Sequence, residues 1–474
     1  MSADLEEMFE ALGRQADKLP LGGAADARGR GRQRTVTRAA ISAAAAVVLV
    51  LVGVGVALRD PHPHAARPAA TPGLPLVGTV DLGTSNPTDA HTAQDGVRAY
   101  VAWTKYEDHT SWVVAAGLRS GTPAWAARRP IDDPGRTISQ VVAVPSAVLV
   151  VTSPNSGQAS GRGLFAFAPD TGVPLWRGSA AADDSLAFTD QMLVRSSRAG
   201  GVVEGIDWRT GSRAWRADLR TDRPLRTLAV PNPADEEQID RAGPRPSSAD
   251  GRVVTVTVGG QVEVRQSARG DVIKRTSIPA GSGDTMVAYD TILFSHDEAD
   301  DDGGPHHIRA TDLDAGLGSH MIGTVSGEFV AMGSCGPGRV CVKTVPGSAS
   351  PGLLTAFDAY GRRKLWQAKS TYGGEEISSA RGYTMLSSWG GSTELFDKDG
   401  KQVFTATLVA GWLDAGTLLI IAPDGTGRWA RWSIADRKLH PIGPPPQETD
   451  GFCASTSSVV ACPTPDGLRL WRVA

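Results

Sequence analysis

GLFAFAPDTGVPLW, residues 163–176, decides the fold, because variants of this strand–turn–strand stretch recur almost to the end of the chain. Its apolar run ends at Thr171-Gly172, a pair that predicts a left-handed turn, since glycine reaches positive φ without a Cβ penalty. Trp176 follows four residues after this glycine. A unit that repeats at roughly 40–50 residues is typical of an array of small sheets. The repeat therefore predicts an architecture and names no ligand.

Eight copies of this hairpin are recognisable, and a tryptophan marks the clearest of them. The clear copies span residues 112–125, 163–176, 202–215 and 353–366, and the weaker ones span 262–275, 308–321, 393–404 and 429–440. The turn-to-tryptophan pairs are Gly121 with Trp125, Gly172 with Trp176, Gly211 with Trp215, and Gly361 with Trp366. An indole at a fixed place in each sheet has one economical use, which is to pack one sheet against the next. We therefore expect these residues to have structural roles.

Two more short strands precede each hairpin, as in ISQVVAV and AVLVVTS within residues 138–153. Four antiparallel strands per unit, repeated around an axis, make a β-propeller. The 55 glycines and 31 prolines suit a fold with many turns. The sequence therefore predicts an all-β propeller over residues 76–474.

The hairpin resembles the repeat of the pyrroloquinoline-quinone-type (PQQ-like) propeller family, whose consensus places Asp, Thr-Gly and Trp in this order. Asp170, Thr171-Gly172 and Trp176 match that order closely. The copy at Trp208-Arg209-Thr210-Gly211 lacks the Asp, and the copies within residues 262–321 lose most of the signature. The resemblance covers residues 76–474 and implies a propeller.

The cofactor chemistry of the quinoprotein dehydrogenases in this family does not carry over. Those enzymes use a disulfide between adjacent cysteines, a calcium held by carboxylate and amide, and a catalytic Asp. No two cysteines are adjacent in this chain, and no position matches the calcium or catalytic residues. We therefore expect no cofactor and no catalytic residue from the resemblance, which carries the scaffold alone.

The two ends of the propeller region indicate how the ring closes. The chain ends on GLRLWRVA (467–474), a third strand with no fourth strand after it, and LPLVGTVDL (74–82) can supply the missing outer strand. Eight hairpins plus this shared sheet allow nine sheets. Because eight is the commoner number in the PQQ-like family, we expect about eight four-stranded blades, with seven to nine possible.

Residues 39–58 form twenty consecutive residues without a charge, long enough at 1.5 Å per residue to span a bilayer as one transmembrane helix. Five arginines within residues 28–38 precede this segment, and few charges follow it. The positive-inside bias places residues 1–38 in the cytoplasm and the propeller outside the cell. A cleaved signal peptide is the competing interpretation, but the region before the apolar run is long for one. We expect a single-pass protein of the cell membrane.

Residues 4–19 carry apolar side chains at helical spacing on an otherwise polar segment. This pattern predicts a short amphipathic helix that docks a cytoplasmic protein. A helix lying on the inner leaflet is the alternative. The tail resembles those of actinobacterial single-pass sigma-factor regulators, and the composition suits an actinobacterial source. Residues 59–75, rich in proline and alanine, predict a semi-extended linker.

The four cysteines fall into two close pairs, Cys335 with Cys341 and Cys453 with Cys462. Each pair lies across the predicted turn between the first two strands of its sheet. An even count at paired spacing predicts disulfides in an oxidising compartment. Zinc is the alternative, but no CxxC spacing or nearby histidine supports it.

The densest acidic run, residues 297–307, places Glu298, Asp300 and Asp302 like the opening of a calcium loop. Arg309 stands where such a loop needs a bidentate Glu. These three residues are therefore weak metal candidates, and a solvated loop is the simpler interpretation. Residues 231–251 are a long polar insertion, either a flap over one face of the ring or tolerated extra length.

Two classes of function remain open. In the first, the propeller is a non-catalytic platform that binds an extracytoplasmic protein, peptide or glycan, and the N-terminal tail signals to a cytoplasmic partner. In the second, it is a quinoprotein-like or hydrolase enzyme with its active site in the central funnel. No short catalytic motif is present, and the net charge of −3 gives no field that recruits nucleic acid. We favour the platform.

Overall fold

The computed structural model describes the chain from residue 75 onward. The described ranges are 75–84, 87–154, 161–231, 251–280, 282–297, 305–315, 318–347, 351–371, 376–388, 392–407, 409–414, 416–421, 429–443, 453–456, 458–464 and 467–473. The chain divides into two compact units, residues 1–70 and 71–474, and every described residue belongs to the second. The predicted helices at 4–19 and 39–58, and the linker up to residue 74, lie outside the described residues. Within those ranges no helix is long and apolar enough to cross a membrane.

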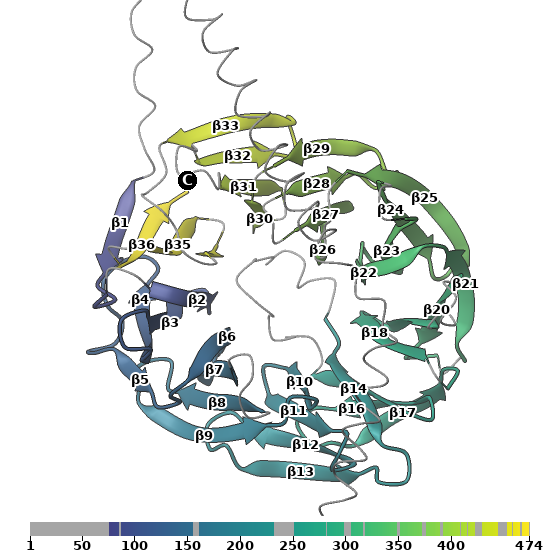
Figure 1. Cartoon of the computed structure of the whole chain (residues 1–474), viewed down its shortest axis with the longest axis horizontal. Coiled ribbons are helices and arrows are strands. Elements are labelled where there is room, and N and C mark those ends of the chain that lie inside the picture. The colour runs from purple at the N-terminus through teal and green to yellow at the C-terminus, as the bar shows by residue number, and fades with distance from the viewer. Residues whose placement is uncertain are drawn as a thin grey trace, which may run out of the picture. The chain divides into compact units, whose positions relative to one another are not determined.

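The described strands form nine four-stranded antiparallel sheets arranged around a central axis (Figure 1). We number the sheets in chain order and give their strands from the inside of the ring to its rim. Sheet 1 is β2 (Pro87–Gln94), β3 (Arg98–Lys105), β4 (Ser111–Gly117) and β5 (Arg129–Ile131); sheet 2 is β6 (Arg136–Val144), β7 (Ala147–Pro154), β8 (Arg162–Phe167) and β9 (Pro174–Ala180); sheet 3 is β10 (Ser185–Phe188), β11 (Met192–Ser197), β12 (Val202–Asp207) and β13 (Arg213–Asp218). Sheet 4 is β14 (Pro224–Ala229), β15 (Arg252–Thr257), β16 (Gln261–Gln266) and β17 (Val272–Ser277); sheet 5 is β18 (Ser282–Tyr289), β19 (Ile292–Asp297), β20 (His306–Asp312) and β21 (His320–Val325); sheet 6 is β22 (Glu328–Ser334), β23 (Arg339–Val345), β24 (Gly352–Asp358) and β25 (Arg363–Ser370). Sheet 7 is β26 (Glu376–Ala380), β27 (Tyr383–Ser387), β28 (Thr393–Phe396) and β29 (Gln402–Ala406); sheet 8 is β30 (Val409–Asp414), β31 (Thr417–Ile421), β32 (Trp429–Ser433) and β33 (Lys438–Gly443); sheet 9 is β34 (Ala454–Ser455), β35 (Val459–Thr464), β36 (Gly467–Arg472) and β1 (Leu76–Val80).

The blade number corrects the sequence-based expectation, since the described residues contain nine blades and the expected number was eight. Each of the eight hairpins found in the sequence belongs to a complete sheet, including the four weaker copies. The signature residues thin out in these copies because a strand pair needs only strand-forming residues and a turn between them, and sheets 4, 5, 7 and 8 keep both.

The ring closes through its first strand, as the sequence predicts. β1 pairs antiparallel with β36, and this pairing joins Leu76 to Trp471 and Val80 to Leu468. Sheet 9 therefore takes three strands from the end of the chain and one from the start of the propeller. This pairing gives sheet 9 its rim strand and ties the two ends of the ring together.

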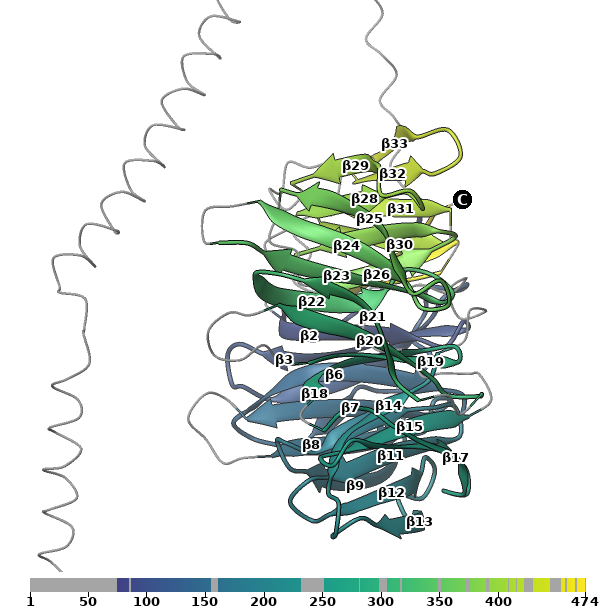
Figure 2. The same cartoon turned by 90° about the vertical axis from the view of Figure 1, so that its right-hand side faces the viewer.

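The ring has two faces, which are visible edge-on in Figure 2. We call the side that carries the turns between the third and fourth strands the hairpin face. The opposite side carries the connections from each rim strand to the next inner strand, and we call it the crossover face. Antiparallel order within every sheet fixes this division, because successive connections alternate between the two sides.

Four tryptophans on the hairpin face pack each sheet against the next one. Three indole N–H groups donate to backbone carbonyls in the following hairpin turn: Trp125 to Pro169 at 2.8 Å, Trp176 to Trp208 at 2.7 Å, and Trp215 to Ser267 at 2.6 Å. Each ring lies over the glycine of that turn, in the pairs Trp125–Gly172, Trp176–Gly211, Trp215–Gly270 and Trp366–Gly400. These glycines have positive φ, and an added Cβ would lie within 2.5 Å of the ring. Glycine is therefore required twice, for backbone conformation and for space.

Two seams replace the tryptophan, and the left-handed position of the turn they meet is not glycine. The imidazole Nε2 of His320 on β21 lies 3.1 Å from a backbone carbonyl of the next turn, where Arg362 takes the left-handed conformation (φ 49°). Phe404 on β29 occupies the equivalent place in sheet 7, and the hairpin turn of the following sheet has Arg437 at φ 55°. A Cβ is therefore tolerated at the turn when a ring smaller than indole lies against it.

Both predicted disulfides are confirmed. Cys335 and Cys341 join the first two strands of sheet 6, with Cα atoms 5.6 Å apart. Cys453 and Cys462 do the same in sheet 9, with Cα atoms 4.3 Å apart. Each bond ties an inner strand to its neighbour, so the cysteines serve the scaffold.

Candidate polar pocket on the crossover face

A buried polar cluster between sheets 6 and 7 combines a lysine, a serine and a glutamate, the residue types of a catalytic site. Lys343 Nζ donates to Ser370 Oγ at 2.9 Å, and Ser370 Oγ donates to the carboxylate of Glu394. Glu394 also accepts the Thr371 N–H at 2.9 Å and the Gln402 side-chain amide at 2.9 Å. Burial lowers the pKa of Lys343, and the charge of Glu394 opposes that shift.

This cluster has no access for a substrate. Lys343 and Ser370 are 0% exposed and Glu394 is 1% exposed. The network joins four strands of two adjacent sheets and compensates a charge that burial would otherwise make costly. We therefore assign it to the scaffold.

A second group, at the seam of sheets 5 and 6, brings together aromatic and histidine rings. The ring of His296 stacks on Phe329 with centroids 4.1 Å apart, and His306 lies edge-on to His296 at 5.7 Å. His306 Nε2 lies 3.2 Å from the carbonyl of Gly327. Among the described residues no three His, Cys, Asp or Glu side chains are placed to hold a metal ion. The predicted candidates Glu298, Asp300 and Asp302 lie outside the described residues.

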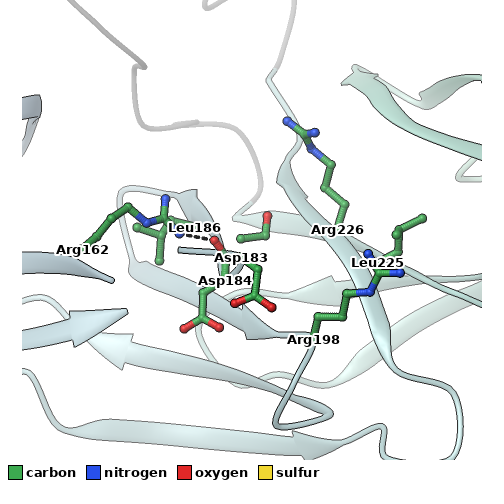
Figure 3. A pocket seen from close by; sticks show the side chains of 8 residues that line it. Arg162, Asp183, Asp184, Leu186, Arg198, Leu225 and Arg226 are labelled. Atoms are coloured by element: carbon green, nitrogen blue, oxygen red, sulfur yellow. Dashed lines mark hydrogen bonds between the residues drawn. The ribbon is translucent and has the colours of Figure 1, made fainter. Parts of the chain in front are cut away.

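The candidate site is a polar pocket of about 380 Å³ on the crossover face, where sheets 2, 3 and 4 meet (Figure 3). Its eight lining residues come from the start of β8, the start of β10 and the residues before it, the end of β11, and the start of β14. They are Arg162, Asp183, Asp184, Ser185, Leu186, Arg198, Leu225 and Arg226. Five of these eight side chains carry a formal charge.

The inner strand beside this pocket, β10, is short and regular. It has only four residues, and its pairing with β11 contains no bulge. The neighbouring inner strand β14 does contain one, where the register shifts between Pro224 and Arg226 and leaves Leu225 outside the ladder. The inner strands β2, β6, β18, β22 and β30 share this shift, so β10 departs from the more common pattern. Ser185 Oγ links the two inner strands by donating to the carbonyl of Thr227 at 2.8 Å.

One arginine holds the connection that forms the pocket wall. The guanidinium of Arg162 donates to the backbone carbonyls of Asp184 and Ala181, which lie between β9 and β10. Burial lowers the pKa of Arg162, and the nearby carboxylates of Asp184 and Asp183 raise it. Arg162 therefore shapes the loop and balances part of the negative charge.

Asp184 differs from the aspartates at the equivalent place in the sheets on either side. Before β6, Asp133 accepts from the hydroxyl of Thr152 and pairs with Arg136 Nε at 3.2 Å. Before β14, Asp222 accepts from Thr257 Oγ1 at 2.5 Å and from the Gly259 N–H at 2.7 Å. In both aspartates each carboxylate oxygen has a partner.

In sheet 3 one carboxylate oxygen has no partner. Asp184 is 7% exposed, and its Oδ2 accepts the Ala181 N–H at 2.9 Å. Its Oδ1 is buried and has no hydrogen-bond donor among the described residues. In sheets 2 and 4 the hydroxyls of Thr152 and Thr257 donate to the equivalent aspartates. In sheet 3 β11 ends with Ser197, whose hydroxyl accepts the Gly200 N–H at 3.2 Å and does not donate to Asp184 Oδ1. A buried carboxylate oxygen without a donor is costly in a scaffold.

Two further charges in the pocket face solvent. Asp183 and Arg198 are both exposed, and neither forms a hydrogen bond or an ion pair with another described residue. Figure 3 shows the carboxylates of Asp183 and Asp184 between the guanidinium of Arg162 on one side and those of Arg198 and Arg226 on the other. The side of the pocket with Arg198 and Arg226 therefore carries positive charge alone, and the side with Arg162 carries both signs.

The sequence did not single out any residue of this pocket. Asp170, which matches the family signature, lies on the hairpin face and pairs with Arg98. The lining residues come from four separate strands or loops, and none belongs to a motif. The one available signal was local: sheets 2 and 4 carry Thr at the end of the second strand, and sheet 3 does not.

The comparisons with known proteins agree with this architecture. Residues 109–288 match a family model described as outer membrane protein assembly factor BamB. The search of curated proteins found no match to the sequence. The matched residues are similar to repeats of the PQQ-like family, and the described strands form a nine-bladed β-propeller.

Solved structures overlap with the chain only loosely. The crystal structure of BamB from Moraxella catarrhalis has 13% identity and a TM-score of 0.43, and the match covers 84% of this chain and 99% of that one. The computationally designed Ika8 protein has 13% identity and a TM-score of 0.44, with 72% and 98% covered. The Dos1 propeller has 10% identity and a TM-score of 0.46, with 84% and 95% covered. These overlaps carry no argument about function.

Proposed function

We propose that this chain is a single-pass membrane protein whose propeller acts outside the cell as a non-catalytic binding module. The crossover face at sheets 2–4 is the binding surface, and the polar pocket is its centre. The observation that carries this proposal is that Asp183 and Arg198 line one recess without ion-pair partners among the described residues. A recess in which a few polar groups converge is the usual form of a ligand-binding site.

The placement outside the membrane rests on the sequence. Residues 39–58 are uncharged over a length that spans a bilayer, and the arginines before them favour a cytoplasmic N-terminus. The two disulfides fit an oxidising compartment on the far side of that membrane. The amphipathic segment at residues 4–19 would then dock a cytoplasmic protein and report binding outside.

The binding surface is tested by crosslinking in cells, with identification of the captured partners. Leu225→Trp places a larger side chain in the pocket, and Val173→Trp places the same side chain at an exposed position on the hairpin face. We expect L225W to lose an extracytoplasmic partner that the wild type and V173W retain. If L225W captures the same partners as V173W, the pocket is not the binding surface.

The cytoplasmic role is tested in the same cells by deleting residues 1–27, which removes the amphipathic segment and leaves residues 28–38 before the apolar run. The expected result is loss of a cytoplasmic partner with no change in the extracytoplasmic ones. A deletion that loses no partner contradicts the docking helix and leaves the propeller proposal untouched.

A further inference from the structure

We propose that the pocket on the crossover face binds the charged backbone ends of an amino acid or a short peptide, with an ammonium group toward β10 and a carboxylate toward β14. This inference rests on the proposed function, because it names the ligand class of the same pocket. It follows from three groups of the pocket: the exposed carboxylate of Asp183, the buried Oδ1 of Asp184, and the exposed guanidinium of Arg198.

The β10 side of the pocket attracts a cation. Asp183 is exposed and forms no ion pair with any described residue. Behind it lies the buried carboxylate of Asp184, whose Oδ1 has no donor in the described part of the chain. Arg162 balances one of these two charges, and the other is left over. An ammonium group supplies both a positive charge and donors for a carboxylate, and such charge-assisted hydrogen bonds are strong.

The β14 side of the pocket attracts an anion. Arg198 stands at the turn after β11, exposed and without an ion pair among the described residues. Arg226 lies on β14 beside it, at the bulge that pushes Leu225 into the pocket. A guanidinium binds a carboxylate through two parallel hydrogen bonds, which gives direction as well as affinity.

Other ligand classes leave one side of the pocket unsatisfied. A simple anion would meet Asp183, and a metal ion would meet Arg162, Arg198 and Arg226. A neutral sugar would meet no aromatic ring, because the eight lining residues include none. A volume of about 380 Å³ lies within the range of small-molecule sites. A dipolar ligand of this size satisfies both sides.

The test uses the full chain and a panel of glycyl dipeptides Gly-X, with X each of the twenty amino acids, in ligand-detected NMR titrations. Each dipeptide is compared with its N-acetylated and its C-terminally amidated form. We expect at least one dipeptide to bind with a Kd of about 1 mM or tighter. Loss of either terminal charge should raise the Kd of that dipeptide by about tenfold or more, as expected for one charge-assisted hydrogen bond.

Variants assign the two ends. Asp183→Asn should raise the Kd of the free dipeptide by about tenfold and leave the Kd of the N-acetylated form unchanged. Arg198→Gln should weaken the free dipeptide and leave the amidated form unchanged. Arg216→Gln, an exposed arginine on the rim strand β13, is the matched control and should change neither. Asp183 and Arg198 are exposed, so both variants should fold.

Two results overturn the inference: no dipeptide binding below 10 mM (roughly the weakest Kd such a titration detects), or equal binding of the N-acetylated and free forms. The partner capture described above separates this failure from failure of the binding module. If L225W loses its partner and no dipeptide binds, the ligand class is wrong and the binding surface stands. If L225W keeps every partner, the proposed function itself fails.

Discussion

Replacing Gly211 with alanine should destabilise the propeller far more than a surface turn substitution normally does. Gly211 has φ 66°, and an added Cβ would lie 2.5 Å from Cγ of Trp176 in the preceding sheet. The left-handed backbone costs an L-residue about 1–2 kcal/mol. Crowding against a packed ring costs about 1–3 kcal/mol. The free energy of unfolding should therefore fall by about 2–5 kcal/mol.

The chain offers a matched control at the equivalent turn position of sheet 6. Arg362 already takes the left-handed conformation, and its turn meets His320 in place of an indole. Arg362→Ala should change the free energy of unfolding by no more than about 0.5 kcal/mol. Urea denaturation of residues 71–474, followed by tryptophan fluorescence, measures both variants.

A double-mutant cycle isolates the contribution of the indole. In a Trp176→His background the Cβ of G211A meets a smaller ring, as it does at Arg362. We therefore expect the cost of G211A to drop by the crowding share, about 1–3 kcal/mol. A cost that is equal in the two backgrounds, within about 0.5 kcal/mol, would refute the claim that the ring sets the need for glycine.

Three further outcomes follow from the scaffold. Removing either disulfide, for example by Cys335→Ser with Cys341→Ser, should lower the free energy of unfolding by about 2 kcal/mol, because each bond closes a short loop; a shift of the urea midpoint measures it. Burial alone would raise the pKa of the Asp207 carboxyl, but hydrogen bonds from Thr210 and from the Arg209 N–H hold this pKa below its usual value. Its contribution is therefore present above the unfolded-state pKa of about 3.9 and is lost as pH falls through the lower folded-state value, so Asp207→Asn should flatten the acid limb of a stability–pH curve. Lys343→Met leaves the buried carboxylate of Glu394 without a positive charge nearby and should lower the free energy of unfolding by about 3–5 kcal/mol. A second substitution, Glu394→Leu, should restore most of this loss in the same denaturation assay.

Much of the fold could be predicted because each sheet repeats one local pattern. The turn glycines and the tryptophans after them identify the third and fourth strands, and the unpaired ends of the propeller region indicate how the ring closes. The blade number was wrong because a family preference for eight outweighed a count that allowed nine. The replacement of Trp by His320 and Phe404 was missed, since an imidazole or phenyl ring at that place has no signature until the next turn is in view.

The pocket could not be predicted, for a physical reason. Its charges come from β8, β10, the end of β11 and β14, and propeller closure alone brings them together. The free oxygen of Asp184 is visible only by contrast with Asp133 and Asp222, whose partners lie on another strand. A single sequence shows three acidic residues in three loops and does not show which one lacks a partner.

The central claim is that the crossover face at sheets 2–4 is the binding surface of this propeller. It is tested most directly by placing a photo-crosslinking amino acid at Arg198 in the full chain in cells, and at Val173 on the hairpin face as the control. Both positions are exposed. The account predicts a discrete crosslinked product from position 198 and none from position 173. Equal products from the two positions, or a product from position 173 alone, would contradict it.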